Sequence, residues 1–329
     1  MNPAFSVILL TTLIGAGQGL FLALASLQMY ALAGLLPPAE GRALAVTGSA
    51  VALVLLAGGL VASFFHLGRP ERAWRTATMW RTSWLSREVI VLPAFMGAVA
   101  LYGLLYASGF NPVLASSARG TALDLALLVA VVGSVLAFAL FVCTAMIYAA
   151  VRFLAEWHTP LTLVNYTLMG GASGFTLAAA LAALVEPQRV PFLCGWAIAL
   201  TALAAAGRWA SLARNARLAP RSTLQSAIGV KHPLIVQRSM GFMGGSYNTR
   251  EFFHGASARR LRWIRPVFLL LAFALPLALL ALGRAQPPAA AAAPLLAAFG
   301  VQYLGLLAER WFFFAQARHP QNLYYQAVA

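Results

Sequence analysis

The stretch HLGRPERAWRTATMWRTSWLSRE, residues 66–88, joins two long apolar runs and decides how the rest of the chain is organised. His66 ends the first run and Glu88 begins the second, and the intervening residues are mostly polar and rich in arginine. An ionisable pair placed where apolar spans enter water marks a functional site by default, because burying a charge near hydrocarbon is costly. We therefore expect a site at this stretch.

The composition indicates an integral membrane protein. Of the 329 residues, 61% are hydrophobic and only 9% are charged, and the mean hydropathy is +0.79. That composition supplies too little polar surface to cover a soluble globule of this size. The net charge of +15 is high enough for nucleic-acid binding, but the basic residues lie between apolar runs, which is typical of membrane loops. We expect membrane lipid, and no nucleic acid, around this chain.

Eight apolar runs are long enough to cross roughly 30 Å of hydrocarbon at about 1.5 Å per residue, although the sixth and seventh are short. The predicted fold is all-α, a polytopic bundle of eight transmembrane helices in a single integral membrane domain, 1–329. The first run lacks the features of a removed signal peptide, and Pro276 within the seventh predicts a kink whose freed carbonyl needs a partner. The expected spans are 5–35, 44–65, 89–107, 123–151, 164–185, 192–206, 267–282 and 289–314.

Arginine residues orient the bundle. They are concentrated in the connections after the second, fourth and sixth expected spans and in the carboxyl-terminal tail. The opposite connections contain only Arg42, Arg119, Arg189 and Arg284. By the positive-inside rule, both termini and the 66–88 stretch are expected on the cytoplasmic side of a bacterial inner membrane.

The segment 207–266 is the longest connection, and we expect it to be a basic cytoplasmic loop that docks a partner on the cytoplasmic face. Arg250, Phe252, Phe253 and His254 supply residue types that suit a protein interface. Attraction to anionic lipid headgroups is the alternative, at about 1 kcal/mol per basic residue near the surface. The mixture of glycine turns and aromatic residues favours docking, because a lipid patch requires only charge.

Metal ligands are scarce in this sequence. Cys143 and Cys194 lie in separate apolar runs without a CxxC spacing, so we expect no disulfide framework, iron–sulfur cluster or zinc site. A transmembrane b-type haem requires axial histidines inside the bundle, and only His66 lies near the end of a span. We therefore expect no haem and no metal in this chain, and any metal on a partner.

The 66–88 stretch and the spans resemble the membrane anchor subunit family of the dimethyl sulfoxide reductase type. In that family an eight-helix protein ties a molybdenum catalytic subunit and an iron–sulfur subunit to the quinone pool. The resemblance therefore implies a molybdopterin catalytic subunit and an iron–sulfur electron-transfer subunit as partners, which carry the molybdenum cofactor and the clusters. It rests on the number of spans and on Gln18 among glycines, His66, Leu67, Gly68, Pro70, Arg72, Ala73, Leu85, Ser86, Glu88, Glu309 and Arg310.

The same resemblance implies that His66 and Glu88 bind quinone, either ubiquinone or menaquinone. We expect His66 to hydrogen-bond a quinone oxygen and pass a proton, because imidazole titrates near neutral pH, and Glu88 to relay protons from the cytoplasm. The alternative is structural, with Glu88 capping its helix or pairing with Arg87 or Arg81. Arg81, Trp84 and Arg87 are weaker candidates for the rim of the pocket, and Trp84 also fits an interfacial aromatic belt.

The long basic insert, which contains GFMGGSYNTREFFHG, resembles the anchor of cytoplasmic sulfite dehydrogenases more than the enteric dimethyl sulfoxide reductase anchor. The implied function is to pass electrons between the iron–sulfur subunit and the quinone pool, with sulfite oxidation coupled to quinone reduction; this chain alone is non-catalytic. One alternative is a complex of the dimethyl sulfoxide reductase type that oxidises quinol, and another is a passive anchor. An eight-span transporter would show inverted repeats and midplane polar groups, and we find neither in the sequence.

Overall fold

The computed structural model describes residues 1–37, 42–116, 122–219, 223–236 and 254–320. Within these ranges the fold is all-α and polytopic, with eight helices long and apolar enough to cross a membrane, as the sequence predicts. The seventh span is continuous through α9, η3 and α10. The spans are α1 (Phe5–Leu32), α2 (Ala43–Phe64), α3 (Trp84–Ser108), α4 (Leu125–Ala149), α5 (Pro160–Val185), α6 (Val190–Ala216), α9 (Ala258–Leu269) with η3 (Leu270–Ala274) and α10 (Leu275–Ala285), and α11 (Pro288–Ala315).

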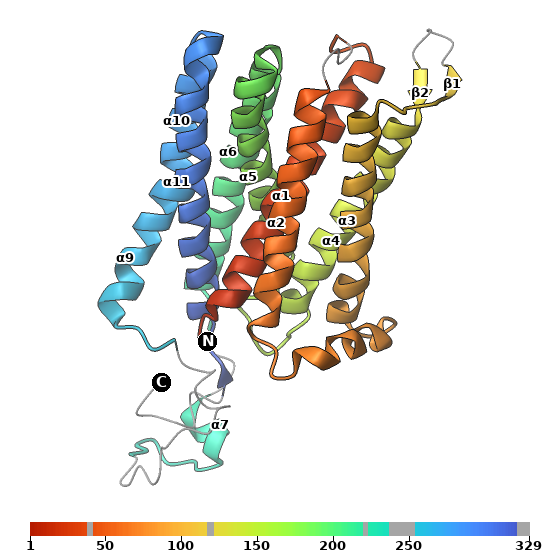
Figure 1. The fold of residues 1–329 in the computed structure, drawn as a ribbon. Helices are drawn as coiled ribbons and strands as arrows, with labels where there is room; N and C mark the ends of the chain where they lie inside the picture. The colour runs from red at the N-terminus through yellow and green to blue at the C-terminus, as the bar shows by residue number, and fades with distance from the viewer. Residues whose placement is uncertain (38–41, 117–121, 220–222, 237–253, 321–329) are drawn as a thin grey trace.

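The connections gather at two ends of the bundle (Figure 1). One end carries η1 (Pro70–Met79), α7 (Leu224–Ile228), the loop 150–159 and the amino terminus. We call it the basic end, because the arginine-rich connections lie there. The opposite end carries the hairpin of β1 (Val113–Ser116) and β2 (Ala122–Asp124), and the short η2 (Pro187–Arg189).

Helices α1 and α5 form the centre of the bundle and are its most buried spans. They touch backbone to backbone at Gly19 and Gly174, where a Cβ atom would overlap main-chain atoms of the other helix. Glycine at these positions therefore allows an approach that no larger residue permits. The other spans pack around this pair, with α3 and α4 on one side and α6 and α11 on the other (Figure 1).

An aromatic cluster fixes the loop 150–159 against α11 at the basic end. Trp157 stacks on Phe313 with ring centroids 5.4 Å apart, and its Nε1 donates a hydrogen bond of 3.0 Å to the Phe313 carbonyl. Tyr148 and Tyr166 stack beside this pair with centroids 5.7 Å apart. Packing therefore holds this end of α4, α5 and α11 together, and Tyr166 from the cluster also lines the cavity described below.

The expectation that the sixth and seventh spans are short was wrong. Helix α6 has 27 residues and ends at Ala216, and the seventh span runs over 28 residues from Ala258 to Ala285. The sixth continues past its first arginine because Arg208 is buried and paired with a carboxylate from α11. Both ends of segment 207–266 are therefore helical, and residues 217–257 connect the two spans.

Candidate functional site

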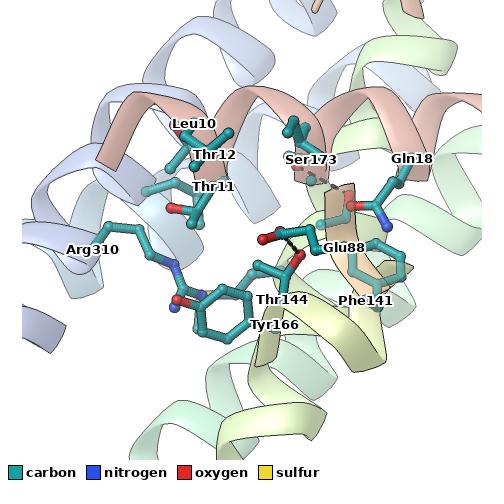
Figure 2. A pocket seen from close by; sticks show the side chains of 15 residues that line it. Leu10, Thr11, Thr12, Gln18, Glu88, Phe141, Thr144, Tyr166, Ser173 and Arg310 are labelled. Atoms are coloured by element: carbon teal, nitrogen blue, oxygen red, sulfur yellow. Dashed lines mark hydrogen bonds between the residues drawn. The ribbon is translucent and has the colours of Figure 1, made fainter. Parts of the chain in front are cut away.

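An internal cavity lies between α1, α3, α4, α5 and α11, and we call it the Glu88 cavity (Figure 2). Glu88 lies four residues after the start of α3, and Thr144 and Arg310 lie five residues before the ends of α4 and α11. At about 1.5 Å per residue, these side chains start roughly 6–8 Å inside the helix ends. The polar part of its wall comprises Thr11, Gln18, Glu88, Thr144, Tyr166 and Arg310, among others.

Glu88 is buried in this wall, with only 7% of its surface exposed. Its carboxylate accepts a hydrogen bond from the Thr144 hydroxyl, and it forms no ion pair with another described residue. The amino-terminal cap of α3 is Ser83, whose side chain accepts a hydrogen bond from the Ser86 amide. Glu88 thus neither caps its helix nor pairs with Arg87 or Arg81, so the structural alternative does not account for it.

The weaker candidates for the rim lie outside the cavity wall. The Arg87 guanidinium donates hydrogen bonds of 2.9 and 2.7 Å to the carbonyls of Trp80 and Arg81, and it lies 4.2 Å from the centre of the Trp84 ring. Arg81 lies over the Trp80 ring at 5.3 Å. These contacts fix the turn between η1 and α3, so Arg87 points back along its own chain.

The structure does not bring His66 into the Glu88 cavity. His66 follows α2 at the basic end, is exposed, and is absent from the cavity wall. Partial desolvation of its ring lowers the pKa of His66 below its usual value. At neutral pH its imidazole is therefore uncharged and able to accept a proton.

Of the residues expected to dock a partner, Arg250, Phe252 and Phe253 lie outside the described residues. His254 is partly buried, and its Nδ1 accepts a hydrogen bond of 3.0 Å from the Ala256 amide. Burial lowers the pKa of His254. Docking by this segment stays a prediction.

A buried charge cluster adjoins the cavity. Arg208 Nε lies 2.7 Å from Glu309 Oε1, Arg310 Nε lies 3.3 Å from Glu309 Oε2, and all three residues are buried. The Arg310 guanidinium also lies 3.7 Å from the centre of the Tyr166 ring. Arg208, Thr144 and Tyr166 were not among the site residues expected from the sequence.

A signal for Arg208 was nevertheless present in the sequence. Thr201, Ala204, Arg208, Ser211 and Leu212 are all buried, at spacings of three and four residues that define one face of a helix. The run of small and apolar residues on this face continues through Arg208. The spacing of these residues along the sequence therefore favours a sixth span that continues beyond Arg208.

Fold and site together define a multi-pass membrane protein with an acidic, partly polar cavity near one end of an otherwise apolar bundle. Among the described residues no group of three or more His, Cys, Asp or Glu side chains could hold a metal ion. Residues 1–244 match the DMSO reductase anchor subunit (DmsC) family. The chain is also similar to a sulfite dehydrogenase subunit of Allochromatium vinosum, with 56% identity over 333 positions and complete coverage of both proteins. It belongs to the DMSO reductase anchor subunit family.

Proposed function

We propose that this chain is the membrane anchor and quinone-binding subunit of a sulfite dehydrogenase. In this proposal a molybdopterin subunit oxidises sulfite, an iron–sulfur subunit carries the electrons to the membrane, and quinone is the acceptor. The relative from Allochromatium vinosum, named as a sulfite dehydrogenase subunit, supports the choice of substrate. The observation that carries the proposal is the burial of Glu88 in a polar cavity close to the basic end.

The donors and acceptors of the Glu88 cavity suit a quinone ring. Gln18 and Arg310 supply N–H donors, Glu88 supplies a carboxyl group, and Leu10, Phe141 and Leu306 supply apolar walls. The volume of the cavity is about 20 Å³, which is close to the volume needed to hold one water molecule. Binding of the ring therefore requires movement of flexible lining side chains, of which Met169 is the most adaptable.

This chain's residues handle protons rather than electrons. Oxidation of sulfite with water yields sulfate, two electrons and two protons, and reduction of quinone to quinol consumes two electrons and two protons. In the proposal, Glu88 gives a proton to an oxygen atom of the quinone. Arg310 and Gln18 orient the quinone ring by hydrogen bonds. In the proposal, His66, uncharged at neutral pH and exposed at the basic end, exchanges protons with water there.

A complex of the dimethyl sulfoxide reductase type is the second candidate, favoured by the family match. There quinol is the donor, and Glu88 accepts a proton instead of giving one. The same residues serve both directions. Turnover with sulfite as donor, compared with turnover with dimethyl sulfoxide as acceptor, separates the two candidates.

The partners are proposed to dock at the basic end, which is proposed to face the cytoplasm of a bacterium. The arginine-rich sequence of segment 207–266 and of η1 supplies the basic residues for docking. In the proposed single membrane domain, 1–329, the Glu88 cavity lies on the side that would face the docked iron–sulfur subunit, with its side chains starting roughly 6–8 Å inside the helix ends.

Glu88→Gln in the purified complex tests the proposal. With sulfite as donor, we expect turnover with a short-chain ubiquinone analogue to fall by about a hundredfold, because the proton donor is lost, while turnover with ferricyanide is unchanged. His66→Ala should have a smaller effect, since His66 lies outside the cavity wall. Asp124→Asn is the matched control, because Asp124 lies at the opposite end of the bundle and asparagine can also cap α4.

Unchanged quinone turnover in Glu88→Gln would contradict the proposal and leave the chain an anchor without a quinone site at this position. A parallel loss with both acceptors would indicate failed assembly. In that case Thr144→Val, which removes the hydroxyl that Glu88 binds while keeping the shape of the side chain, supplies the second test.

A further inference from the structure

A second cavity adjoins the first, between α5, α6, α11 and the loop 150–159. Its wall includes Glu156, Asn165, Arg208 and Glu309, and we call it the Glu309 cavity. It shares Tyr166, Met169 and Arg310 with the Glu88 cavity. Its volume is about 10 Å³, which is close to the minimum volume that holds one water molecule. The two cavities thus meet at Tyr166 and Arg310, which Figure 2 shows on the side of the Glu88 cavity opposite Phe141.

Several buried polar atoms around the Glu309 cavity have no hydrogen-bond partner among the described residues. They include Asn165 Oδ1, the Tyr166 hydroxyl and Arg208 Nη2. The carboxylate oxygens of Glu309 are ion-paired with the two arginines, at 2.7 Å from Arg208 Nε and 3.3 Å from Arg310 Nε. Buried polar atoms are almost always hydrogen-bonded, so atoms that lack a protein partner indicate bound water.

Glu156 lies in the wall of the Glu309 cavity, on the loop 150–159 at the basic end. It is half-buried in the loop 150–159, and both neighbours in the chain are fixed. Arg214 Nη1 donates a hydrogen bond of 3.0 Å to the Ala155 carbonyl, and the Trp157 indole binds the Phe313 carbonyl at 3.0 Å. Glu156 is thus held in the wall of the Glu309 cavity, and the charged group that faces it is the amino terminus of Met1.

We propose that the two cavities form a proton route from the basic end to Glu88, running from Glu156 through water held by Asn165, Glu309 and the Tyr166 hydroxyl. The inference rests on the proposed function, and it supplies the step that function requires. Each proton that Glu88 gives to the substrate is replaced by one that Glu156 takes from water outside. No other atom is gained or lost along the route.

The charges of the region permit this transfer. Arg208 and Arg310 remain protonated and cannot carry the proton, but they hold Glu309 in place and orient water around it. The two arginines are offset by the carboxyl groups of Glu156, Glu309 and Glu88, so a proton does not enter a region of excess positive charge. The other charged or titratable groups near Glu88 are Arg87, Cys143, Tyr148, Tyr166 and Arg310. None of the Cys or Tyr groups is an acid strong enough to replace Glu156.

The test compares Glu156→Gln with Asp124→Asn, at the opposite end of the bundle, in the purified complex. With sulfite as donor and a short-chain ubiquinone analogue as acceptor, we expect Glu156→Gln to slow turnover by about tenfold or more at pH 8, and by less at pH 6, where protons are plentiful. The solvent deuterium isotope effect should rise as proton uptake limits the rate. Glu156→Asp should restore most of the rate, and turnover with ferricyanide should not change.

Tyr166→Phe tests the junction of the two cavities independently. It should slow quinone turnover and raise the isotope effect in the same way, while Tyr106→Phe, which changes a tyrosine bound to Gln28 near the far end of α3, should not. If Glu88→Gln abolishes quinone turnover but Glu156→Gln and Tyr166→Phe keep normal rates and isotope effects, this route is overturned and the quinone proposal stands. If Glu88→Gln is also without effect, both fail.

Discussion

At the scale of single residues, the contact between α1 and α5 depends on glycine. A Cβ atom on Gly174 would overlap the main chain of Gly19 and Leu20, and one on Gly19 would overlap Gly170. In most helices, replacing glycine by alanine is favourable by about 1 kcal/mol. Here the obstacle is backbone that cannot move independently, so the sign reverses.

We therefore expect Gly174→Ala to destabilise the protein by about 1–3 kcal/mol, the range found for overpacked interiors. The measurement is the temperature at which half of the detergent-solubilised protein aggregates. Gly97→Ala is the matched control, because a Cβ there meets nothing within 4 Å. Equal stabilities of the two variants would mean that α1 and α5 can separate without cost.

The residue scale also shows how far the site could be predicted. Glu88 could be found because it is the first ionisable residue of an apolar run, so that the fold has to bury it. Thr144 and Tyr166 could not be found, because their meeting with Glu88 depends on the rotation of α4 and α5 about their axes. His66 was grouped with Glu88 because both flank one polar stretch, yet it follows the end of α2 and stays in water.

At the scale of helices, the seventh span shows a kink that the sequence could predict. Pro276 lacks the amide that would bind the Ala272 carbonyl, and the chain forms the π-helical turn η3 just before it. Gln302 Nε2 from α11 lies 3.5 Å from that carbonyl and 3.1 Å from Thr201 Oγ1 on α6. The proline predicts the need for a partner, but only the packed structure identifies Gln302.

The pairing of α6 with α11 gives a prediction at the same scale. Arg208 is 2% exposed and binds Glu309 on the other helix. Removing one member of a buried ion pair commonly costs about 3–5 kcal/mol, because the remaining charge loses its partner in a medium of low polarity. We therefore expect Arg208→Leu to lower the stability by an amount toward the lower end of this range, because Arg310 still contacts Glu309.

Aggregation temperature in detergent again measures the effect of Arg208→Leu. Arg217→Leu is the control, since Arg217 is the exposed carboxyl-terminal cap of α6. A loss of stability no greater than that of Arg217→Leu would show that the pair between α6 and α11 is not required for packing. It would also shift the role of Arg208 from stability to the proton route.

At the scale of the whole molecule, charge is distributed unequally between the two ends. The arginine-rich connections gather at the basic end, whereas the far end has four arginines in its connections. One of these, Arg189, is buried beside Glu186 at 3.9 Å and donates a hydrogen bond of 3.0 Å to the Pro37 carbonyl. Its charge is thus offset inside the protein, which makes the difference between the ends larger than the count of arginines indicates.

The number and order of the spans could be predicted because each is defined locally, by a run of apolar residues. The ends of α6 and α9 could not, because they depend on pairing between distant parts of the chain. Arg208 looked like the first charged residue of the loop 207–266 until its partner on α11 was known. Errors of prediction in this molecule thus concentrate at buried charges, where long-range contacts override local hydropathy.

The unequal charge predicts which end faces the cytoplasm, and single cysteines can test it. Thr78→Cys on η1 and Gln286→Cys after α10 place exposed thiols at opposite ends, while the native Cys143 and Cys194 are buried. In intact bacteria, a membrane-impermeant maleimide should label Gln286→Cys and not Thr78→Cys. In inside-out vesicles the pattern should reverse.

The same cysteines test where the partners dock. If they cover the basic end, Thr78→Cys should react several times faster in vesicles from cells that produce this chain alone than in vesicles that hold the whole complex. Gln286→Cys in intact cells should react equally in both. Labelling of Thr78→Cys from outside intact cells would overturn the orientation, and protons for Glu88 would then have to come from the other side of the membrane. Equal labelling of Thr78→Cys in both vesicle preparations would instead move the partners away from η1 and leave the orientation standing.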